Sequence, residues 1–149
     1  MENLKIAATA KTPEIDFNYS TGELVSTGIS IPENPAKLYE VVLEWVKDYA
    51  EQPSKITNLR LNLEYFNTSS VIWIAKIVKV LSSMKKKEAT LMVHLYYDIH
   101  EFESMEAEDI ADTISPIIGI VESPEISIGI KIYGLDTDGQ ILKETMVFI

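Results

Sequence analysis

The chain has 149 residues, of which 46% are hydrophobic and 24% charged, and these values predict one globular domain. Its formal net charge of −10 disfavours nucleic acid and anionic membrane surfaces as partners, but would steer in a basic protein. The absence of cysteine excludes disulfides, thiolate metal sites and a cysteine nucleophile. We expect a cytoplasmic protein, because neither a signal-peptide pattern nor a membrane-spanning stretch is present.

The first thirty residues predict a β-hairpin or meander. Lys5–Thr9 and Ile15–Tyr19 have the composition of short strands, and a turn signal at 20–22 precedes a third apolar stretch at Glu23–Ile29.

The next segment predicts an amphipathic helix that ends before Pro53. Asn34 can cap its start, and Pro35 can occupy the first helical position, where the missing N–H is not needed. Apolar residues then recur at helical spacing, at Leu38, Val42, Trp45 and Tyr49.

Residues 56–97 predict a strand–helix–strand unit. Ile56–Phe66 alternates as a strand with one buried face, the period becomes helical from Ser69, and Ala89–Tyr97 forms the next strand. Because such a unit requires a crossover, we expect the two strands to be parallel neighbours.

The remaining chain predicts an acidic helix over Glu101–Thr113, ended by Pro116, and a β-hairpin formed by Ile126–Tyr133 and Gln140–Ile149. The complete order of elements predicts an α/β or α+β fold with a mixed sheet.

Nothing in the sequence indicates an enzyme. His94 and His100 are more typical of structural or surface positions, and the chain lacks a nucleophile elbow, a glycine-rich phosphate loop and a zinc-protease motif. The acidic run at 98–112 does not match an EF-hand loop, so it indicates a solvated helix face, which is compatible with docking of a basic partner. We therefore expect no metal and no cofactor.

The polar stretch Asn67-Thr68-Ser69-Ser70 lies at the predicted strand–helix junction. Such side chains cap a helix by accepting hydrogen bonds from its first N–H groups. The same helix end tolerates an anion, so a phosphate on Thr68 would alter docking without disrupting the helix. The residues alone leave a cap and a switch open.

Tyr96 and Tyr97 lie at the carboxyl end of a predicted central strand, where ligands and partners tend to bind in open α/β sheets. Packing of one tyrosine inward and of the other over the rim explains them equally well.

The stretch LEYFNTSS at 63–70 resembles the signature of the SiaC family of bacterial regulatory phosphoproteins. Three further stretches resemble the same family. The first is KTPEI at 11–15 followed by Gly22, and the second is PEN at 32–34 followed by Tyr39, by LEW at 43–45 and by Tyr49. The third is YYD at 96–98 followed by MEA at 105–107. Together they cover roughly residues 4–115.

The resemblance implies a fold related to the anti-sigma-factor antagonist (STAS) domain, with Thr68 as the phosphoacceptor. It implies a Ser/Thr kinase of the histidine-kinase-like ATPase type, a PP2C-type phosphatase and, in some members, a diguanylate cyclase that links the switch to cyclic-di-GMP and biofilm formation. Ser69 stays an alternative phosphoacceptor. The helix cap would be shaped by Asn67, Ser69 and Ser70. A neighbouring contact surface would be formed by Tyr65, Tyr96 and Tyr97.

The C-terminal part, about 117–149, does not match the family pattern and is expected to be an extension of a single domain spanning 1–149. It could cover a sheet edge, form a homodimer or present another partner surface. The expected function is a non-enzymatic, phosphorylation-switched adaptor. The alternative is a small-molecule-binding module at the rim near Tyr96, which a deep apolar pocket without an exposed hydroxyl would favour.

Overall fold

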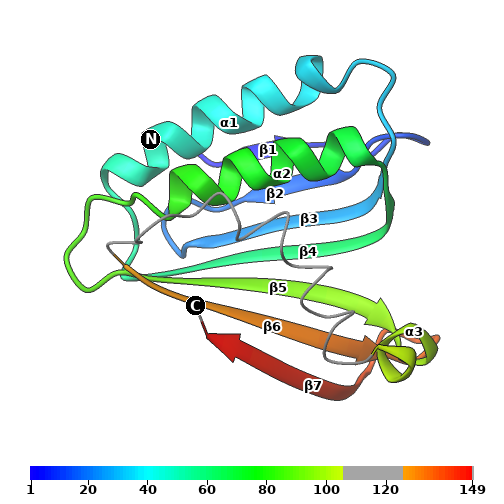
Figure 1. Ribbon diagram of the computed structural model, residues 1–149. Helices are drawn as coiled ribbons and strands as arrows, with labels where there is room; N and C mark the ends of the chain where they lie inside the picture. Colours follow the sequence, from blue (N-terminus) through cyan, green and yellow to red (C-terminus); the bar gives the residue numbers. More distant parts are fainter. Residues whose placement is uncertain (106–125, 149) are drawn as a thin grey trace.

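A computed structural model describes residues 1–105 and 126–148. Seven strands form one sheet in chain order (Figure 1): β1 Leu4–Ile6, β2 Glu14–Phe17, β3 Glu23–Ser30, β4 Ile56–Phe66, β5 Thr90–Asp98, β6 Ser127–Leu135 and β7 Ile141–Phe148. The helices of the described ranges are α1 Pro35–Glu51, α2 Thr68–Leu81 and α3 Ile99–Ser104.

The sheet is mixed, which confirms the predicted fold class. Strands β1 to β3 are antiparallel, β3 to β6 are parallel, and β7 returns antiparallel to β6. The predicted parallel pairing of β4 with β5 is confirmed, with Ile56 opposite Thr90 and Leu61 opposite Leu95. The predicted C-terminal hairpin is also confirmed, and its first strand covers the edge of β5.

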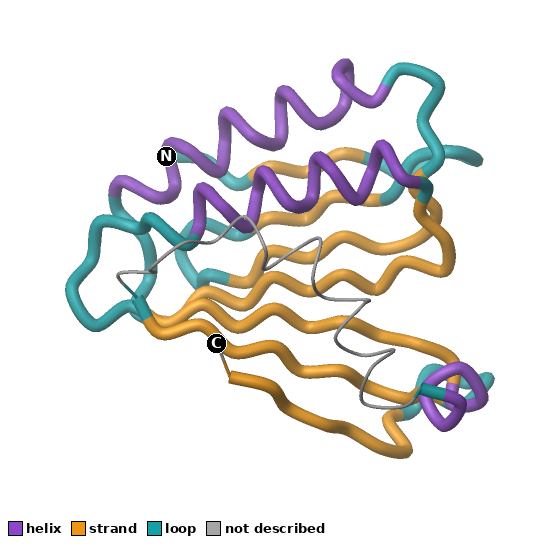
Figure 2. The backbone as a smooth tube through the Cα atoms, in the orientation of Figure 1, coloured by secondary structure: helices purple, strands orange, loops and turns teal. Residues whose placement is uncertain are grey.

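Helices α1 and α2 lie side by side on one face of the sheet (Figures 1 and 2). The side chain of Asn34 accepts a hydrogen bond from the N–H of Lys37, so the predicted cap of α1 is confirmed. The core between helices and sheet contains Val42 and Val46 of α1, Ile74 and Val78 of α2, and alternate residues of the strands, including Leu59, Leu61, Leu91, Val93, Ile130 and Ile132. On the opposite side of the sheet lies neither α1 nor α2, and we call this side the helix-free face, with reference to the described residues alone.

Strands β1 and β2 are shorter than predicted because polar side chains turn the chain. The hydroxyl of Thr9 accepts from the N–H groups of Lys11 and Thr12, and the side chain of Asn18 accepts from those of Ser20 and Thr21. These local bonds compete with strand pairing.

The prediction for the third helix was wrong at its start. The carboxylate of Asp98 accepts from the N–H of His100, so α3 begins at Ile99. It ends at Ser104, since Met105 has an extended backbone with ψ of 120°. Residues 106–113 of the predicted helix, and Pro116, lie outside the described residues.

Candidate functional site

The amino end of α2 directly follows the carboxyl end of β4, and Asn67 caps it as predicted. Its Oδ1 accepts from the N–H of Ser70 at 3.0 Å and lies 3.0 Å from the hydroxyl of Ser69 and 2.8 Å from that of Ser70. The same amide oxygen therefore organises the first turn of the helix.

The three hydroxyls that follow Asn67 have different environments. Ser70 is fully buried, and its Oγ lies 2.8 Å from the hydroxyl and 2.9 Å from the carbonyl oxygen of Ser30. The hydroxyl of Tyr39 is hydrogen-bonded to that of Ser30 and extends this buried set of hydroxyls. Burial raises the pKa of Tyr39. Ser69 is half-buried, whereas Thr68 is exposed and its hydroxyl makes no hydrogen bond to any residue that the structure describes.

Exposed apolar side chains flank Thr68. Tyr65, at the end of β4, is 60% exposed, and Ile72, one helical turn after Thr68, is 53% exposed. Between helices α1 and α2, Trp73 stacks on Tyr39, and the ammonium group of Lys76 lies 4.2 Å from the centre of the indole ring. Exposed apolar side chains therefore precede and follow Thr68 within four residues of the sequence.

The structure brings Tyr65, Tyr96 and Tyr97 to one cleft of about 580 Å³ at the carboxyl ends of β4 and β5. Tyr97 packs against the core, and burial together with the nearby carboxylate of Glu101 raises its pKa to about 12. Tyr96 lies on the helix-free face, where its ring stacks on that of Tyr133 with 4.6 Å between the ring centroids. Thr68 and its cap lie beside the cleft in sequence but do not line it.

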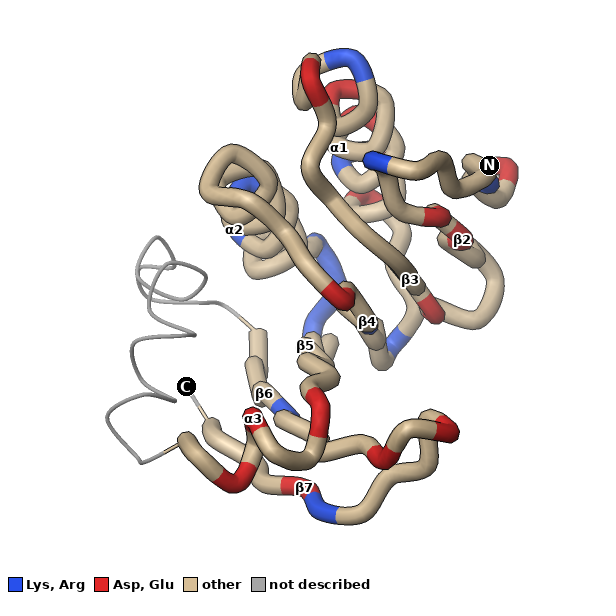
Figure 3. Tube along the Cα trace, turned by 90° about the vertical axis from the view of Figure 1, so that its right-hand side faces the viewer, with Lys and Arg blue, Asp and Glu red and all other residues tan. Residues whose placement is uncertain are grey.

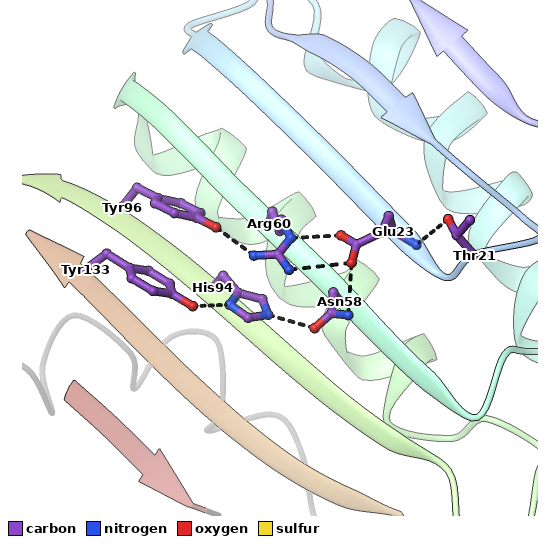
Figure 4. Close-up of polar contacts among 7 residues, drawn as sticks. All are labelled: Thr21, Glu23, Asn58, Arg60, His94, Tyr96 and Tyr133. Atoms are coloured by element: carbon purple, nitrogen blue, oxygen red, sulfur yellow. Dashed lines mark hydrogen bonds and ion pairs between the residues drawn. The ribbon is translucent and has the colours of Figure 1, made fainter. Parts of the chain in front are cut away.

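A polar network on the helix-free face was missed by the sequence analysis (Figure 4). Arg60 donates to Glu23 at 2.7 Å and to the hydroxyl of Tyr96 at 2.8 Å. The amide nitrogen of Asn58 donates to Glu23 at 3.1 Å, which leaves its oxygen to accept from Nε2 of His94 at 2.8 Å.

The neighbours of His94 define its chemical state. With Nε2 donating to Asn58, its Nδ1 accepts from the hydroxyl of Tyr133 at 2.7 Å. Burial and the positive charge of Arg60 lower the pKa of His94 to about 4, so the ring is neutral at pH 7. This environment agrees with the structural role predicted for His94. The sequence signal that could have revealed the network is the alternation of side chains along the strands, which puts Asn58 and Arg60 of β4 and His94 and Tyr96 of β5 on the same face of the sheet.

The buried and the exposed hydroxyl of this cluster are expected to differ in their effect on stability. Ser70→Ala is expected to lower the free energy of unfolding by about 1–2 kcal/mol, because it leaves buried polar groups of Ser30 with fewer partners. Thr68→Ala is expected to change it by less than about 0.5 kcal/mol, since the side chain is exposed. Urea unfolding followed by circular dichroism measures both, and equal losses in the two variants would contradict this assignment.

Within the described ranges, no helix is long and apolar enough to cross a membrane, and no three His, Asp or Glu side chains gather as metal ligands.

Comparison with known proteins places these features in a family. The model of the SiaC family regulatory phosphoproteins matches residues 6–121. An uncharacterized protein of Pseudomonas aeruginosa strain UCBPP-PA14 is 31% identical over 98 residues, which are 66% of this chain and 78% of that protein.

Solved structures agree with the sequence match. The crystal structure of apo-SiaC from Pseudomonas aeruginosa has a TM-score of 0.65 and 25% identity, covering 86% of this chain and 98% of that one. SiaC in the crystal structure of the diguanylate cyclase SiaD with its activator SiaC, from the same species, has a TM-score of 0.65 and 26% identity, covering 84% and 97%. The chain therefore belongs to the SiaC family of regulatory phosphoproteins.

Proposed function

We propose that this chain is a non-enzymatic adaptor whose binding to a signalling partner is controlled by reversible phosphorylation of Thr68. The observation that carries the proposal is the accessibility of its hydroxyl. Ser70 is fully buried and Ser69 donates to Asn67, whereas Thr68 is exposed and free of hydrogen bonds within the described ranges. A kinase can reach Thr68 without unfolding the first turn of α2.

A phosphate on Thr68 would change docking more than stability. It adds a charge of about −1.5 to −2 at the amino end of α2, where the helix dipole favours an anion. A partner that covers Tyr65 and Ile72 would also have to desolvate this dianion, which is costly. The unphosphorylated form is therefore proposed as the one that binds the partner.

The family suggests which partners act on this switch. A Ser/Thr kinase of the histidine-kinase-like ATPase type would add the phosphate, and a PP2C-type phosphatase would remove it. Because a family member is described as the activator of the diguanylate cyclase SiaD, we propose a cyclase of this kind as the output, with cyclic-di-GMP and biofilm formation downstream.

The alternative of a small-molecule-binding module receives less support. The rim near Tyr96 does contain a cleft, but four carboxylates line it, from Glu64, Asp98, Glu101 and Asp136. That alternative also expects no exposed hydroxyl at the strand–helix junction, whereas Thr68 is exposed.

Phosphorylation with the cognate kinase, followed by phosphopeptide mass spectrometry, tests the site. We expect phosphate on wild type and on Ser69→Ala, none on Thr68→Ala, and loss of phosphate after PP2C treatment. Thr68→Asp is expected to bind a SiaD-type cyclase about 10-fold more weakly than Thr68→Ala, because part of the phosphate's charge is reproduced. Unchanged phosphorylation of Thr68→Ala would reject Thr68 as the acceptor.

A further inference from the structure

The sheet opens between β4 and β5 at their carboxyl ends (Figure 1). Their pairing stops at Leu61 and Leu95, after which β4 continues to Phe66 beside β3, and β5 continues to Asp98 beside β6. Residues 62–66 and 96–98 thus present strand edges that no strand of the described ranges pairs on the side of the opening. Unpaired edges of this kind are templates for an added strand.

A β-bulge shapes the β4 side of this opening. Gly28 of β3 lies opposite Leu63, but Ile29 lies opposite Tyr65, so Glu64 is an extra residue without a partner in β3. Bulges are found beside functional sites, where they redirect a side chain. Here Glu64 lines the cleft of about 580 Å³ that lies at the opening between the two strands.

The charge of the cleft has one sign. Glu64, Asp98, Glu101 and Asp136 line it, and no Lys or Arg is among its lining residues in the part of the chain that the structure describes. In Figure 3, the acidic positions gather around α3 and the turn between β6 and β7. Two cations lie close to these elements and each already has an acidic partner: Arg60 is paired with Glu23 and bonded to Tyr96, and Lys143 is paired with Glu103 of α3.

Two of these carboxylates have structural roles and two do not. Asp98 caps α3, and Asp136 accepts from the N–H groups of Asp138 and Gln140 in the β6–β7 turn. The exposed carboxylates of Glu64 and Glu101 make no hydrogen bond or ion pair with any residue in the described ranges. They are therefore available to a ligand.

We propose that the opening between β4 and β5 binds an extended, lysine- or arginine-bearing segment of a protein partner. Its backbone pairs with the free edge of β4 at residues 62–66, and its basic side chains reach Glu64 and Glu101. An added strand satisfies backbone groups, and the acidic lining selects a basic sequence. The inference deepens the adaptor role proposed above and rests on it for the biological partner, but not on the phosphorylation of Thr68.

A labelled peptide tests the proposal on the full, unphosphorylated chain. The probe is a fluorescein-labelled peptide of alternating lysine and valine, and its glutamate–valine counterpart is the charge control. The site variant is Glu64→Gln with Glu101→Gln. The matched variant is Glu40→Gln with Asp48→Asn, which removes the same charge from exposed positions of α1.

We expect the lysine–valine peptide to bind wild type and the matched variant alike, and the site variant about 10-fold more weakly, as two lost ion pairs predict. Hydrogen exchange should slow at the amides of 62–66 when the peptide is bound. Equal weakening of both variants, no binding of the lysine–valine peptide, or no protection at 62–66 would overturn the proposal. The titration uses the unphosphorylated chain, so its result does not depend on whether Thr68 is the phosphoacceptor, whereas the kinase experiment above tests Thr68 without the peptide. Either proposal can therefore fail without the other.

Discussion

Replacing Gly22 with alanine is expected to lower the free energy of unfolding by about 3 kcal/mol or more. Gly22 has φ of +74°, which a residue with a Cβ rarely adopts. A Cβ there would lie 2.5 Å from the backbone oxygen of Ile56, and backbone cannot rotate away as a side chain can. The backbone oxygen of Gly22 also accepts from the N–H of Asn58, so movement at this turn would disturb the start of the β3–β4 pairing.

Gly139→Ala is the matched control for this prediction. Gly139 also has positive φ, +82°, but its added Cβ would meet nothing within 4 Å. The expected loss is about 1 kcal/mol, the cost of the backbone conformation alone. Urea unfolding of the two variants separates the close contact from the backbone cost. Equal losses would show that the contact with Ile56 is relieved without significant energy.

Acidification from pH 6.5 to pH 4 is expected to remove about 2 kcal/mol of stability through His94. The pKa of His94 is lowered to about 4 in the folded chain, against about 6.5 in the unfolded chain. Between these values the unfolded state binds more protons, so the stabilisation present above pH 6.5 is lost as pH falls towards 4. We expect less than the full shift would give, because the charged neighbours of His94, Arg60 and Glu23, are 31% and 39% exposed and solvent screens their charges.

His94→Gln isolates this effect from the carboxylates, which titrate in both proteins. Glutamine can still donate and accept one hydrogen bond each, but it does not titrate. The free energies of unfolding of wild type and variant should therefore converge as pH falls from 6.5 to 4. Curves that stay parallel over this range would contradict the assignment of the pH dependence to His94.

The sequence predicted the elements whose pattern is local. The alternation over 56–66 matches the bounds of β4, and Asn34 and Asn67 cap α1 and α2 as expected. Helix α3 was placed too late, because the cap at Asp98 is a single side-chain contact that periodicity does not reveal.

The site was predictable only in part, for the same reason. The polar stretch at 67–70 identified a cap and a candidate acceptor, but the burial of Ser70 depends on Ser30, forty residues earlier. The network joining Glu23, Arg60 and His94 depends on strand order and register. The opening beyond Leu61 and the bulge at Glu64 are features of strand pairing, which no composition signal marks.

The central claim is that a phosphate on Thr68 controls partner binding. The most direct measurement compares the affinity of a SiaD-type diguanylate cyclase for the unmodified chain and for a homogeneous preparation phosphorylated at Thr68, by isothermal titration calorimetry. The account predicts at least about 10-fold weaker binding of the phosphorylated chain, with recovery after PP2C treatment. Equal affinity of the two forms, or tighter binding of the phosphorylated one, would contradict it.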